Sequence, residues 1–219
     1  MKLITLIMIT IKIFQFNAFQ ENTYLLYDAT GECIIIDPGM SNEKEKNEII
    51  NFISNNNLKP ISVVNTHSHI DHILGIAFLT SKYNIDYYMH KSESEMFNSS
   101  AMVGMSFGMK FDKPEKLPKF LDEGNEVKFG KSILQIFYVP GHSSGSLCFY
   151  SKEDNFLISG DVLFSNSIGR SDLPGGDHNT LIRGIKSKLF TLPDECKVYP
   201  GHGSETTIGD EKKFNPFLK

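Results

Sequence analysis

Three of the seven histidines lie within six consecutive residues, as His67, His69 and His72 of the segment THSHIDH, and Asp71 stands among them. Neutral imidazole and carboxylate groups are the usual nitrogen and oxygen ligands of zinc, and they also bind iron and manganese. His67 and His69 are two residues apart in an expected turn, so both can face one ion. Asp71 and His72 follow where a helix is expected to begin, and they can face a neighbouring point. The segment therefore offers more ligands than one tetrahedral ion requires.

Three further polar residues each come directly after an apolar, strand-like run. His142 follows FYVPG, Asp161 follows FLISG and His202 follows KVYPG, just as His67 follows VVNT. Loops at the ends of strands are where rigid scaffolds present reactive groups. Four strands that each end in histidine or aspartate therefore predict one converging cluster.

Two adjacent divalent metal ions accommodate this whole cluster. We expect the first ion to bind His67, His69 and His142, the second to bind Asp71, His72 and His202, and Asp161 to bridge them. With two aspartates and one bridging hydroxide, two divalent ions leave a net charge of about +1, which favours an anionic substrate. Without metal, so many buried polar groups would be costly to hold together. Zinc is the expected metal, with iron or manganese as alternatives.

Other polar residues have both structural and functional interpretations. His90 and His178 fit neither ligand set and are expected to be structural. Asp37, in IIIDPG, fits either a contact to the metal-binding loops or a plain Asp-Pro turn. Arg170 fits either recognition of a substrate carboxylate or a pair with Asp172 that fixes the loop, and Asp172 is expected to be structural.

The elements that must position the cluster fall into two strand-rich blocks. The pattern of apolar residues predicts strands in the first block at 11–16, 23–29, 32–39, 61–65 and 86–90, with helices at 43–57 and from about 71 to 83. In the second block it predicts strands at 133–140, 146–151, 155–161 and 196–201, with a helix at 178–190. Two such blocks, each finished by helices, predict an α+β fold of two sheets packed face to face with helices outside.

One long segment, residues 98–120, lies outside this pattern. It is so rich in Gly, Pro and Ser that an irregular connection is expected there. Its residues Met102, Met105, Phe107 and Met109 are expected either to pack under the loop or to line the site as a flexible lip, since methionine adapts to irregular surfaces.

Length and composition limit the function classes. The 219 residues predict one domain over 1–219, and a net charge of −4 argues against a nucleic-acid partner. The three cysteines are widely separated, which favours reduced thiols. The apolar run in MKLITLIMIT is too short for a membrane span, and we interpret it as part of a first strand, with Met8 as an alternative start. A cytoplasmic protein with no membrane partner is expected, and nothing in the sequence indicates its oligomeric state.

The segments THSHIDH, PGHSSGS, SGDVLF and YPGHG, in this order, resemble the metallo-β-lactamase superfamily over nearly the whole chain. SIGRSDLPGGDHNTLI, at 167–182, resembles the short bacterial hydroxyacylglutathione hydrolases of the glyoxalase II type. This resemblance implies an αββα sandwich with a dinuclear site on the edge between the two mixed sheets. It also implies hydrolysis of a small-molecule thioester such as S-D-lactoylglutathione by a metal-activated hydroxide, which Asp71 would orient.

The chain departs from the resembled enzymes in two places. Longer glyoxalase II enzymes carry a C-terminal helical domain that grips glutathione, whereas only 17 residues follow His202 here, so no such domain is expected. Ser144 stands where the family more often has proline. The alternatives are a mononuclear-iron persulfide dioxygenase of the same fold, a β-lactamase, a nuclease and a scaffold protein with an inactive site. SIGRSDLPGGD favours the hydrolase over the dioxygenase, and the acidic composition disfavours a nuclease.

Overall fold

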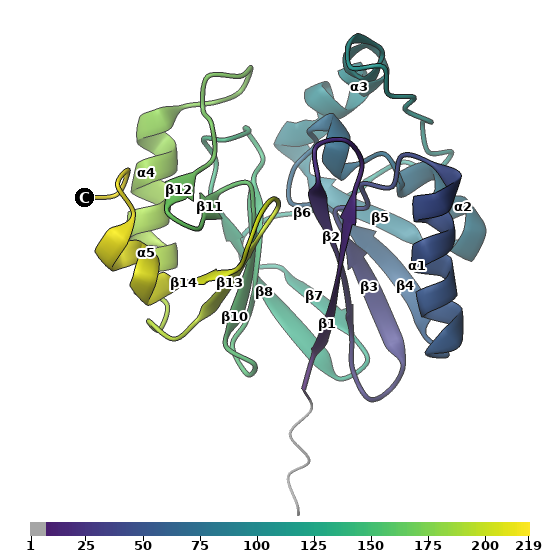
Figure 1. Ribbon diagram of the computed structural model, residues 1–219, viewed down its shortest axis with the longest axis horizontal. Helices are drawn as coiled ribbons and strands as arrows, with labels where there is room; N and C mark the ends of the chain where they lie inside the picture. Colours follow the sequence, from purple (N-terminus) through teal and green to yellow (C-terminus); the bar gives the residue numbers. More distant parts are fainter. Residues whose placement is uncertain (1–7) are drawn as a thin grey trace, which may run out of the picture.

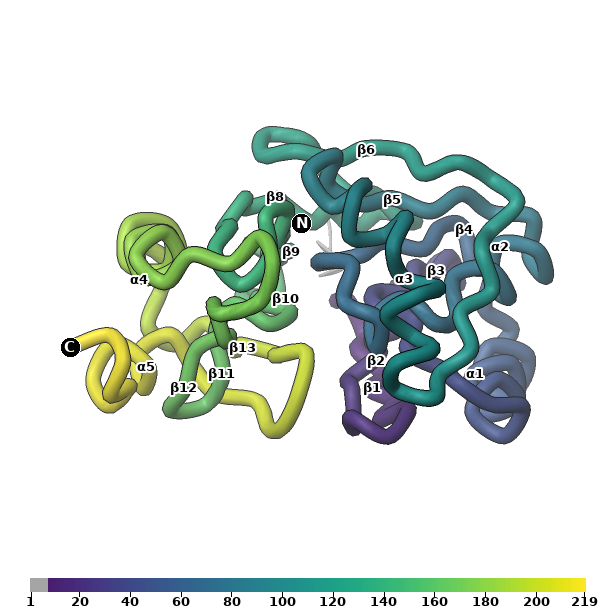
Figure 2. The backbone as a smooth tube through the Cα atoms, turned by 90° about the horizontal axis from the view of Figure 1, so that it is seen from above, coloured from purple at the N-terminus to yellow at the C-terminus, as the bar shows by residue number. Residues whose placement is uncertain are grey.

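Two six-stranded mixed sheets pack face to face, with helices on their outer faces, in the computed structural model (Figure 1). The structure describes residues 8–219, so most of the N-terminal run that we interpret as part of the first strand lies outside the described residues. Viewed from above, the two halves lie side by side, each with its own helices (Figure 2). This is the α+β sandwich that the sequence predicts.

The first sheet has the strand order β1-β2-β3-β4-β5-β6 and the second has the order β14-β13-β10-β9-β8-β7. The strands of the first sheet are β1 (Thr10–Phe16), β2 (Glu21–Tyr27), β3 (Glu32–Ile36), β4 (Lys59–Val64), β5 (Asp86–His90) and β6 (Lys119–Leu121). Those of the second are β7 (Glu126–Phe129), β8 (Ser132–Tyr138), β9 (Leu147–Ser151), β10 (Phe156–Gly160), β13 (Lys197–Pro200) and β14 (Thr206–Thr207). A small hairpin joins β11 (Leu163–Phe164) to β12 (Ser167–Ile168).

The helices cover the outer faces of these sheets. They are α1 (Glu43–Asn55), α2 (Ile76–Tyr83), α3 (Ser94–Ser106), α4 (His178–Ser187) and α5 (Ile208–Phe214), with 3-10 turns η1 (Ile70–His72), η2 (Lys91–Glu93) and η3 (Leu189–Thr191). Within residues 8–219, none of them has the length and apolar character of a membrane span.

Continuous apolar runs in the central strands follow from burial on both faces. In β3, Ile34 and Ile36 face the core between the sheets, while Cys33 and Ile35 face the core under the first-half helices. Successive side chains of a strand point to opposite faces, so a strand covered on both sides needs no polar positions. Leu157 and Ile158 of β10 divide in the same way in the second half.

The prediction of an irregular segment over 98–120 is wrong at both ends, because α3 extends to Ser106 and β6 begins at Lys119. The serine hydroxyls that argue against a helix are accommodated within it. Ser99 and Ser100 donate to the carbonyl of Met96, as serine can do inside a helix. Met102 and Met105 are exposed, whereas Met109 packs on the core.

The helix predicted from about residue 71 begins later, at Ile76. Residues 70–72 form the single 3-10 turn η1, in which the His72 amide donates to the carbonyl of His69 at 3.1 Å. Gly75 then lies against Met40 and the Pro38 carbonyl, where a Cβ atom would collide. The tight turn holds Asp71 and His72 beside the preceding loop instead of on a helix surface.

Candidate metal centre

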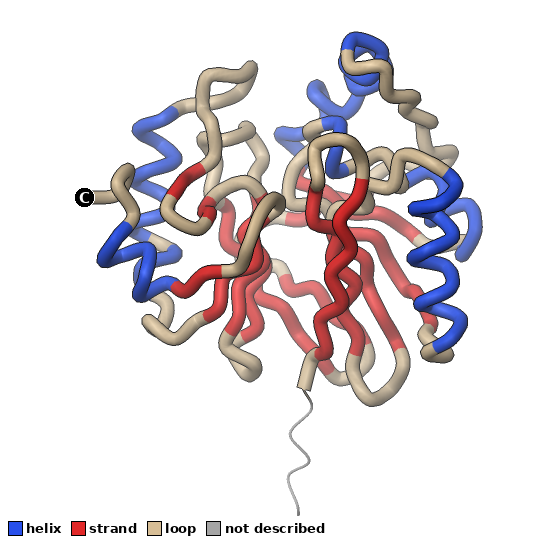
Figure 3. The backbone as a smooth tube through the Cα atoms, in the orientation of Figure 1, coloured by secondary structure: helices blue, strands red, loops and turns tan. Residues whose placement is uncertain are grey.

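Loops from both sheets meet at one edge of the sandwich, where Figure 3 shows loops at the ends of the strands. His67 follows β4, His142 follows β8, Asp161 follows β10 and His202 follows β13. The parallel pairs β3–β4 and β10–β13 end at this same edge, which is why polar residues distant in the sequence converge here.

The first ligand group consists of His67, His69 and His142. Nε2 of His142 lies 3.2 Å from Nε2 of His67 and 2.9 Å from Nδ1 of His69, and the last two atoms are 3.0 Å apart. Their mutual spacing places three nitrogen atoms around one point. This is the set predicted for the first ion.

The second ligand group consists of Asp71, His72 and His202. Nε2 of His202 lies 3.2 Å from Oδ2 of Asp71 and 3.3 Å from Nε2 of His72. His72 Nε2 is also 3.6 Å from the same Asp71 oxygen. This is the set predicted for the second ion.

Asp161 lies between the two ligand groups. Its Oδ2 is 3.5 Å from Nε2 of His142 and 3.6 Å from Nε2 of His202, while its Oδ1 is 3.5 Å from Nε2 of His72. Gly201 leaves room for this carboxylate, because a Cβ atom there would collide with Asp161 Oδ1 and come within 2.7 Å of the His72 ring. The structure thus brings all seven predicted ligands together.

Contacts on the far side of the imidazole rings determine which nitrogen faces inward. His142 Nδ1 lies 2.8 Å from the Arg170 carbonyl and His202 Nδ1 lies 3.1 Å from the Phe19 carbonyl. A carbonyl oxygen can only accept, so Nδ1 carries the hydrogen in both rings and the Nε2 lone pair points into the centre. These backbone contacts prepare both histidines as ligands.

Asp37 orients one histidine of each group. Its Oδ2 lies 3.1 Å from Nδ1 of His72 and accepts from the Thr66 hydroxyl at 2.5 Å, and that hydroxyl lies 2.9 Å from Nδ1 of His67. Its Oδ1 accepts from the Thr66 amide at 2.7 Å. The residue has φ +50°, a turn conformation that aspartate tolerates. The two interpretations of Asp37, turn residue and contact to the metal-binding loops, therefore both describe it.

The donor set fits two cations. Asp161 Oδ1, which lies 3.5 Å from His72 Nε2, is buried and has no hydrogen-bond partner among the described residues. Burial lowers the pKa of His67, and it lowers that of His69 to about 4, so these rings are neutral and their lone pairs are free to bind metal. Inward lone pairs about 3 Å apart repel one another unless a positive charge lies between them.

The second ligand group is richer in negative charge. Burial opposes protonation of His72, but the surrounding carboxylates of Asp71, Asp161 and Asp37 outweigh it and raise the His72 pKa. Burial likewise raises the pKa of Asp71, but the neighbouring His72 and His202 outweigh it and hold that pKa below its usual range. A divalent cation suits this position, because it supplies the positive charge that these carboxylates require.

The two remaining histidines lie apart from the ligand groups. His90 stacks on Tyr138 with ring centroids 4.4 Å apart, and its Nδ1 accepts from the Ser92 amide. His178 begins α4 and contacts Ser171 at 3.3 Å. Neither joins the clusters of potential ligands found among residues 8–219.

Arg170 forms the predicted pair with Asp172. Its Nε and Nη2 atoms donate to the two carboxylate oxygens of Asp172, each at 2.8 Å, so the pair fixes the loop. Arg170 also lines the cleft above the ligand groups. Both side chains of the pair are exposed.

Glu21, a fully buried carboxylate in β2, was not among the predicted site residues. Its Oε1 lies 3.9 Å from Nδ1 of His72 and has no hydrogen-bond partner among the described residues, and burial raises its pKa. Its Oε2 accepts from the Thr23 hydroxyl at 2.8 Å. Only the unusual position of a glutamate in an otherwise buried strand could have indicated it.

A cleft of about 840 Å³ opens above the ligand groups, within the size range of small-molecule sites. His69, Asp71, Asp161 and His202 lie at its floor. Residues of α3 form one wall and those around Leu173 another; the apolar residues of the walls include Phe19, Met96, Val103, Phe107, Phe164 and Leu173. Phe19 and Phe107 pack edge to face at 5.5 Å and join the β1–β2 turn to the end of α3.

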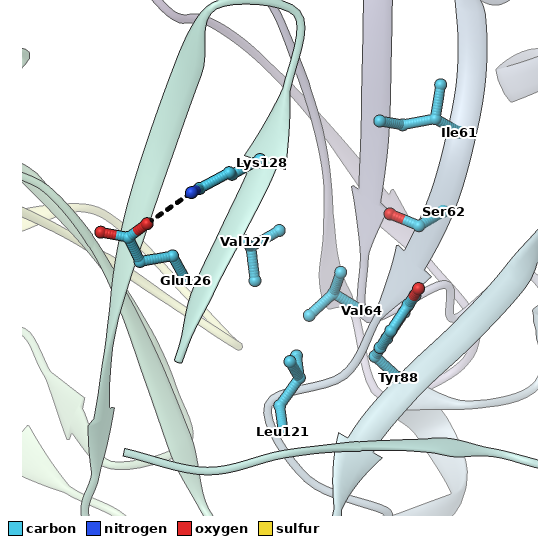
Figure 4. A pocket seen from close by; sticks show the side chains of 8 residues that line it. All are labelled: Ile61, Ser62, Val64, Tyr88, Leu121, Glu126, Val127 and Lys128. Carbon is cyan, nitrogen blue, oxygen red and sulfur yellow. Dashed lines mark ion pairs between the residues drawn. The ribbon is translucent and has the colours of Figure 1, made fainter. Parts of the chain in front are cut away.

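A second, smaller cavity of about 180 Å³ lies between β7 and the strands β4, β5 and β6 (Figure 4). Tyr88, Leu121 and Val127 line it, together with the ion pair between Lys128 and Glu126 at 2.8 Å. It has no histidine or cysteine among its lining residues. The larger cleft is therefore the candidate site for chemistry.

Comparison with known proteins finds relatives along most of the chain. The chain is 37% identical over 200 residues to the probable metallo-hydrolase YqgX of Bacillus subtilis, covering 91% of this chain and 92% of that protein. It is 35% identical over 211 residues to the hydroxyacylglutathione hydrolase GloC of Haemophilus influenzae, covering 95% and 97%.

Solved structures show the same fold. BLEG-1, a B3 metallo-β-lactamase, matches with a TM-score of 0.84 and 34% identity, covering 95% of this chain and 99% of that chain. TTHA1623 in a di-iron-bound form matches with a TM-score of 0.84 and 35% identity, covering 94% and 100%. ETHE1 from Myxococcus xanthus matches with a TM-score of 0.77 and 25% identity, covering 94% and 83%. A family model of the metallo-β-lactamase superfamily matches residues 16–202, and the chain belongs to that superfamily.

Proposed function

We propose that the protein is a metal-dependent thioesterase whose first candidate substrate is a hydroxyacylglutathione such as S-D-lactoylglutathione. The observation that carries the proposal is the pair of ligand groups, joined by Asp161, at the floor of an open cleft. The similarity to the Haemophilus protein named as a hydroxyacylglutathione hydrolase supports this substrate class. The products would be a hydroxy acid and a free thiol.

The ligand groups would hold two divalent ions, which supply a hydroxide nucleophile at neutral pH and a Lewis acid for the carbonyl oxygen. Asp71 faces the cleft, where its carboxylate can accept a hydrogen bond from the attacking water and orient it. The departing thiolate has a conjugate acid with a pKa of about 8.5, so it leaves without a general acid. This explains why the site needs no further proton donor.

The direct test is metal analysis of untreated protein, followed by hydrolysis of S-D-lactoylglutathione measured by the loss of thioester absorbance. We expect about two metal ions per chain, because seven ligands around two points exceed the needs of one ion. Removal of the metal with a chelator should abolish turnover, and zinc, iron and manganese should be compared for its recovery. Fewer than one ion per chain in active protein would contradict the proposal.

Among the described residues, Arg170 is the only Lys or Arg side chain that lines the cleft, which makes it the candidate for binding a substrate carboxylate. For Arg170→Ala we expect KM for S-D-lactoylglutathione to rise about 5- to 30-fold with little change in kcat, since one exposed charge-assisted hydrogen bond is lost. Steady-state kinetics separate the two parameters.

Asp172→Ala is the matched control for Arg170, because it frees the guanidinium but keeps its charge. We expect a smaller rise in KM from this variant. For a thioester whose thiol carries no carboxylate, both substitutions should change KM equally little. Equal KM values for wild type and Arg170→Ala with the glutathione thioester would exclude the role.

Asp37 is proposed to orient His67 through Thr66, and His72 directly. Asp37→Asn keeps the size of the side chain but replaces one acceptor, so Thr66 or His72 loses its partner. We expect metal affinity and turnover to fall about 10- to 100-fold, as is usual for residues that orient metal ligands. Competition with a chelating indicator measures the affinity, and an unchanged affinity would reduce Asp37 to a turn residue.

The alternative is a persulfide dioxygenase with a single iron, and the similarity to a protein crystallised in a di-iron-bound form keeps iron among the candidate metals. One iron held by two histidines and an aspartate would leave four of the seven convergent residues without a role. Oxygen consumption with glutathione persulfide, followed with an electrode, distinguishes the two activities. Uptake at enzymatic rates would replace the thioesterase assignment.

The similarity to BLEG-1 makes β-lactam hydrolysis a further candidate activity, which can be tested directly. A chromogenic cephalosporin offered to the metal-loaded protein would report ring opening by its colour change. We expect this rate to be far below that of thioester hydrolysis. A kcat/KM for the cephalosporin above that for the thioester would favour β-lactam hydrolysis over thioester hydrolysis.

A further inference from the structure

We propose that Glu93 is a positioning residue that joins the two loops of the first ligand group and thereby sets the affinity of the first metal site. The inference rests on the metal centre of the proposed function, but not on the identity of the substrate. Glu93 ends η2 and directly precedes α3, outside every segment that the sequence motifs indicated.

The carboxylate of Glu93 bridges the loops that carry His67, His69 and His142. Its Oε2 accepts from the amide of Ser68, which stands between the first two histidines, at 2.7 Å. Its Oε1 accepts from the amide of Gly145 at 2.6 Å and from the hydroxyl of Ser143, the neighbour of His142, at 2.8 Å. One side chain therefore fixes the distance between the β4 loop and the β8 loop.

This bridge is fully enclosed. The exposed fraction is 0% for Glu93 and Ser143 and 1% for Ser68. Gly145 is required for the close approach, because a Cβ atom there would lie 2.6 Å from Cγ of Glu93. A buried carboxylate is costly unless donors surround it, and here three donors from two loops do so.

The charge of Glu93 is not balanced within the described residues. None of the ion pairs found among residues 8–219 includes it, although it is buried. The first ligand group consists of three imidazoles and has no carboxylate of its own, whereas the second has Asp71. A cation held by His67, His69 and His142 would supply the missing positive charge. Buried negative charge beside neutral ligands favours binding of a cation over leaving the site empty.

Glu93 also connects the metal loops to the wall of the cleft. Helix α3 begins at the next residue and carries Met96 and Val103, which line the cleft. The segment that positions the first ligand group thus positions the apolar wall as well. Movement of this joint would alter metal binding and substrate fit together.

The test is Glu93→Gln, which keeps the size of the side chain but replaces one carboxylate oxygen with an NH₂ group. That group would face an N–H or O–H donor of Ser68, Ser143 or Gly145, with which it cannot form a hydrogen bond. We expect the dissociation constant of Zn²⁺ at the first site to rise about 10- to 100-fold, the usual effect of losing a partner that orients metal ligands. At limiting free Zn²⁺ the variant should hold close to one ion per chain while wild type holds two. Competition with a chelating indicator measures both quantities.

Glu211→Gln is the matched control. Glu211 is 1% exposed and accepts from the Asn166 amide, the Thr206 hydroxyl and the Asn215 side chain, none of which adjoins a ligand. It should lose thermal stability as Glu93→Gln does, yet keep wild-type Zn²⁺ affinity. Equal affinity of Glu93→Gln and wild type would overturn the proposal, as would an equal loss of affinity in Glu211→Gln.

Ser143→Ala provides the test if Glu93→Gln does not fold. It removes one donor and keeps the carboxylate, so affinity should fall about 3- to 10-fold, the effect of one hydrogen bond. An unchanged Zn²⁺ affinity in Ser143→Ala would then count against Glu93. If wild type binds two ions but hydrolyses no thioester, the proposed substrate fails while the role of Glu93 stands.

Discussion

Asp161→Ala is expected to abolish thioester hydrolysis and to lower the metal content of the purified protein. Within residues 8–219, Asp161 is the one residue whose carboxylate lies within 3.6 Å of histidines from both ligand groups. Its removal leaves each group with three ligands and nothing to hold the two ions together. We expect turnover to fall at least about 1,000-fold, because losing a ligand must cost more than the 10- to 100-fold that losing an orienting partner costs.

Metal content per chain and the rate of thioester absorbance loss together check the Asp161 prediction. Asp28→Ala is a suitable control, since Asp28 is also a buried aspartate and accepts from Lys131 and Ser132 in a separate turn. That variant should be less stable but should keep both ions. His69→Ala should behave like Asp161→Ala, because it removes one of three nitrogens from the first ligand group. Retention of two ions and wild-type turnover by Asp161→Ala would refute the bridging assignment.

The seven ligands could be predicted because the ends of strands can be recognised in the sequence. The apolar runs before His67 and Asp161 exist because the ends of β4 and β10 are buried, whereas β8 and β13, before His142 and His202, alternate between buried and more exposed residues. A polar residue after such a run has to lie at the sheet edge. The parallel pairing of β10 and β13, and of β3 and β4, then brings these edges together. The division of the seven residues into two groups followed from ligand number alone.

The α3 segment shows where such reasoning fails. Its serines and glycines favour a loop by composition, and only the tertiary structure reveals the compensation. Phe97 is buried against Tyr87 with ring centroids 5.6 Å apart, and Gly104 lies against the Met109 carbonyl. Packing of this kind outweighs weak helix propensity, because propensity contributes less than burial of an aromatic side chain.

The sequence indicated only one of the residues that orient the ligands, since Asp37 was predicted either to contact the metal-binding loops or to form a turn, whereas Glu93 was not predicted. Asp37 reaches Thr66 and His72 across 29 and 35 positions, and Glu93 reaches Ser143 across 50. Such contacts depend on the path of the loops, which no local pattern encodes. The ligands are thus visible as motifs, whereas the partners of Asp37 and the whole role of Glu93 appear only in three dimensions.

Asp71→Asn is expected to reduce kcat about 100- to 1,000-fold, the range for removing one group preorganised toward the reacting centre. Asp71 is the one member of the second ligand group that supplies negative charge, and its carboxylate faces the cleft. Asparagine keeps one oxygen near His202, so the variant should retain more metal than Asp161→Ala does. The expected signature is therefore a large loss of kcat with a smaller loss of bound metal.

Single-turnover kinetics on Asp71→Asn protein that has been fully loaded with metal separate the two roles of this residue. If Asp71 orients the attacking water, the chemical step stays slow at saturating metal, because an amide cannot accept with the strength of a carboxylate. If Asp71 serves only to hold the ion, excess metal restores the wild-type rate. The second result would show that Asp71 is a metal ligand with no role in the catalytic step. Asp161 would then be the one carboxylate at the floor of the cleft that orients the nucleophile.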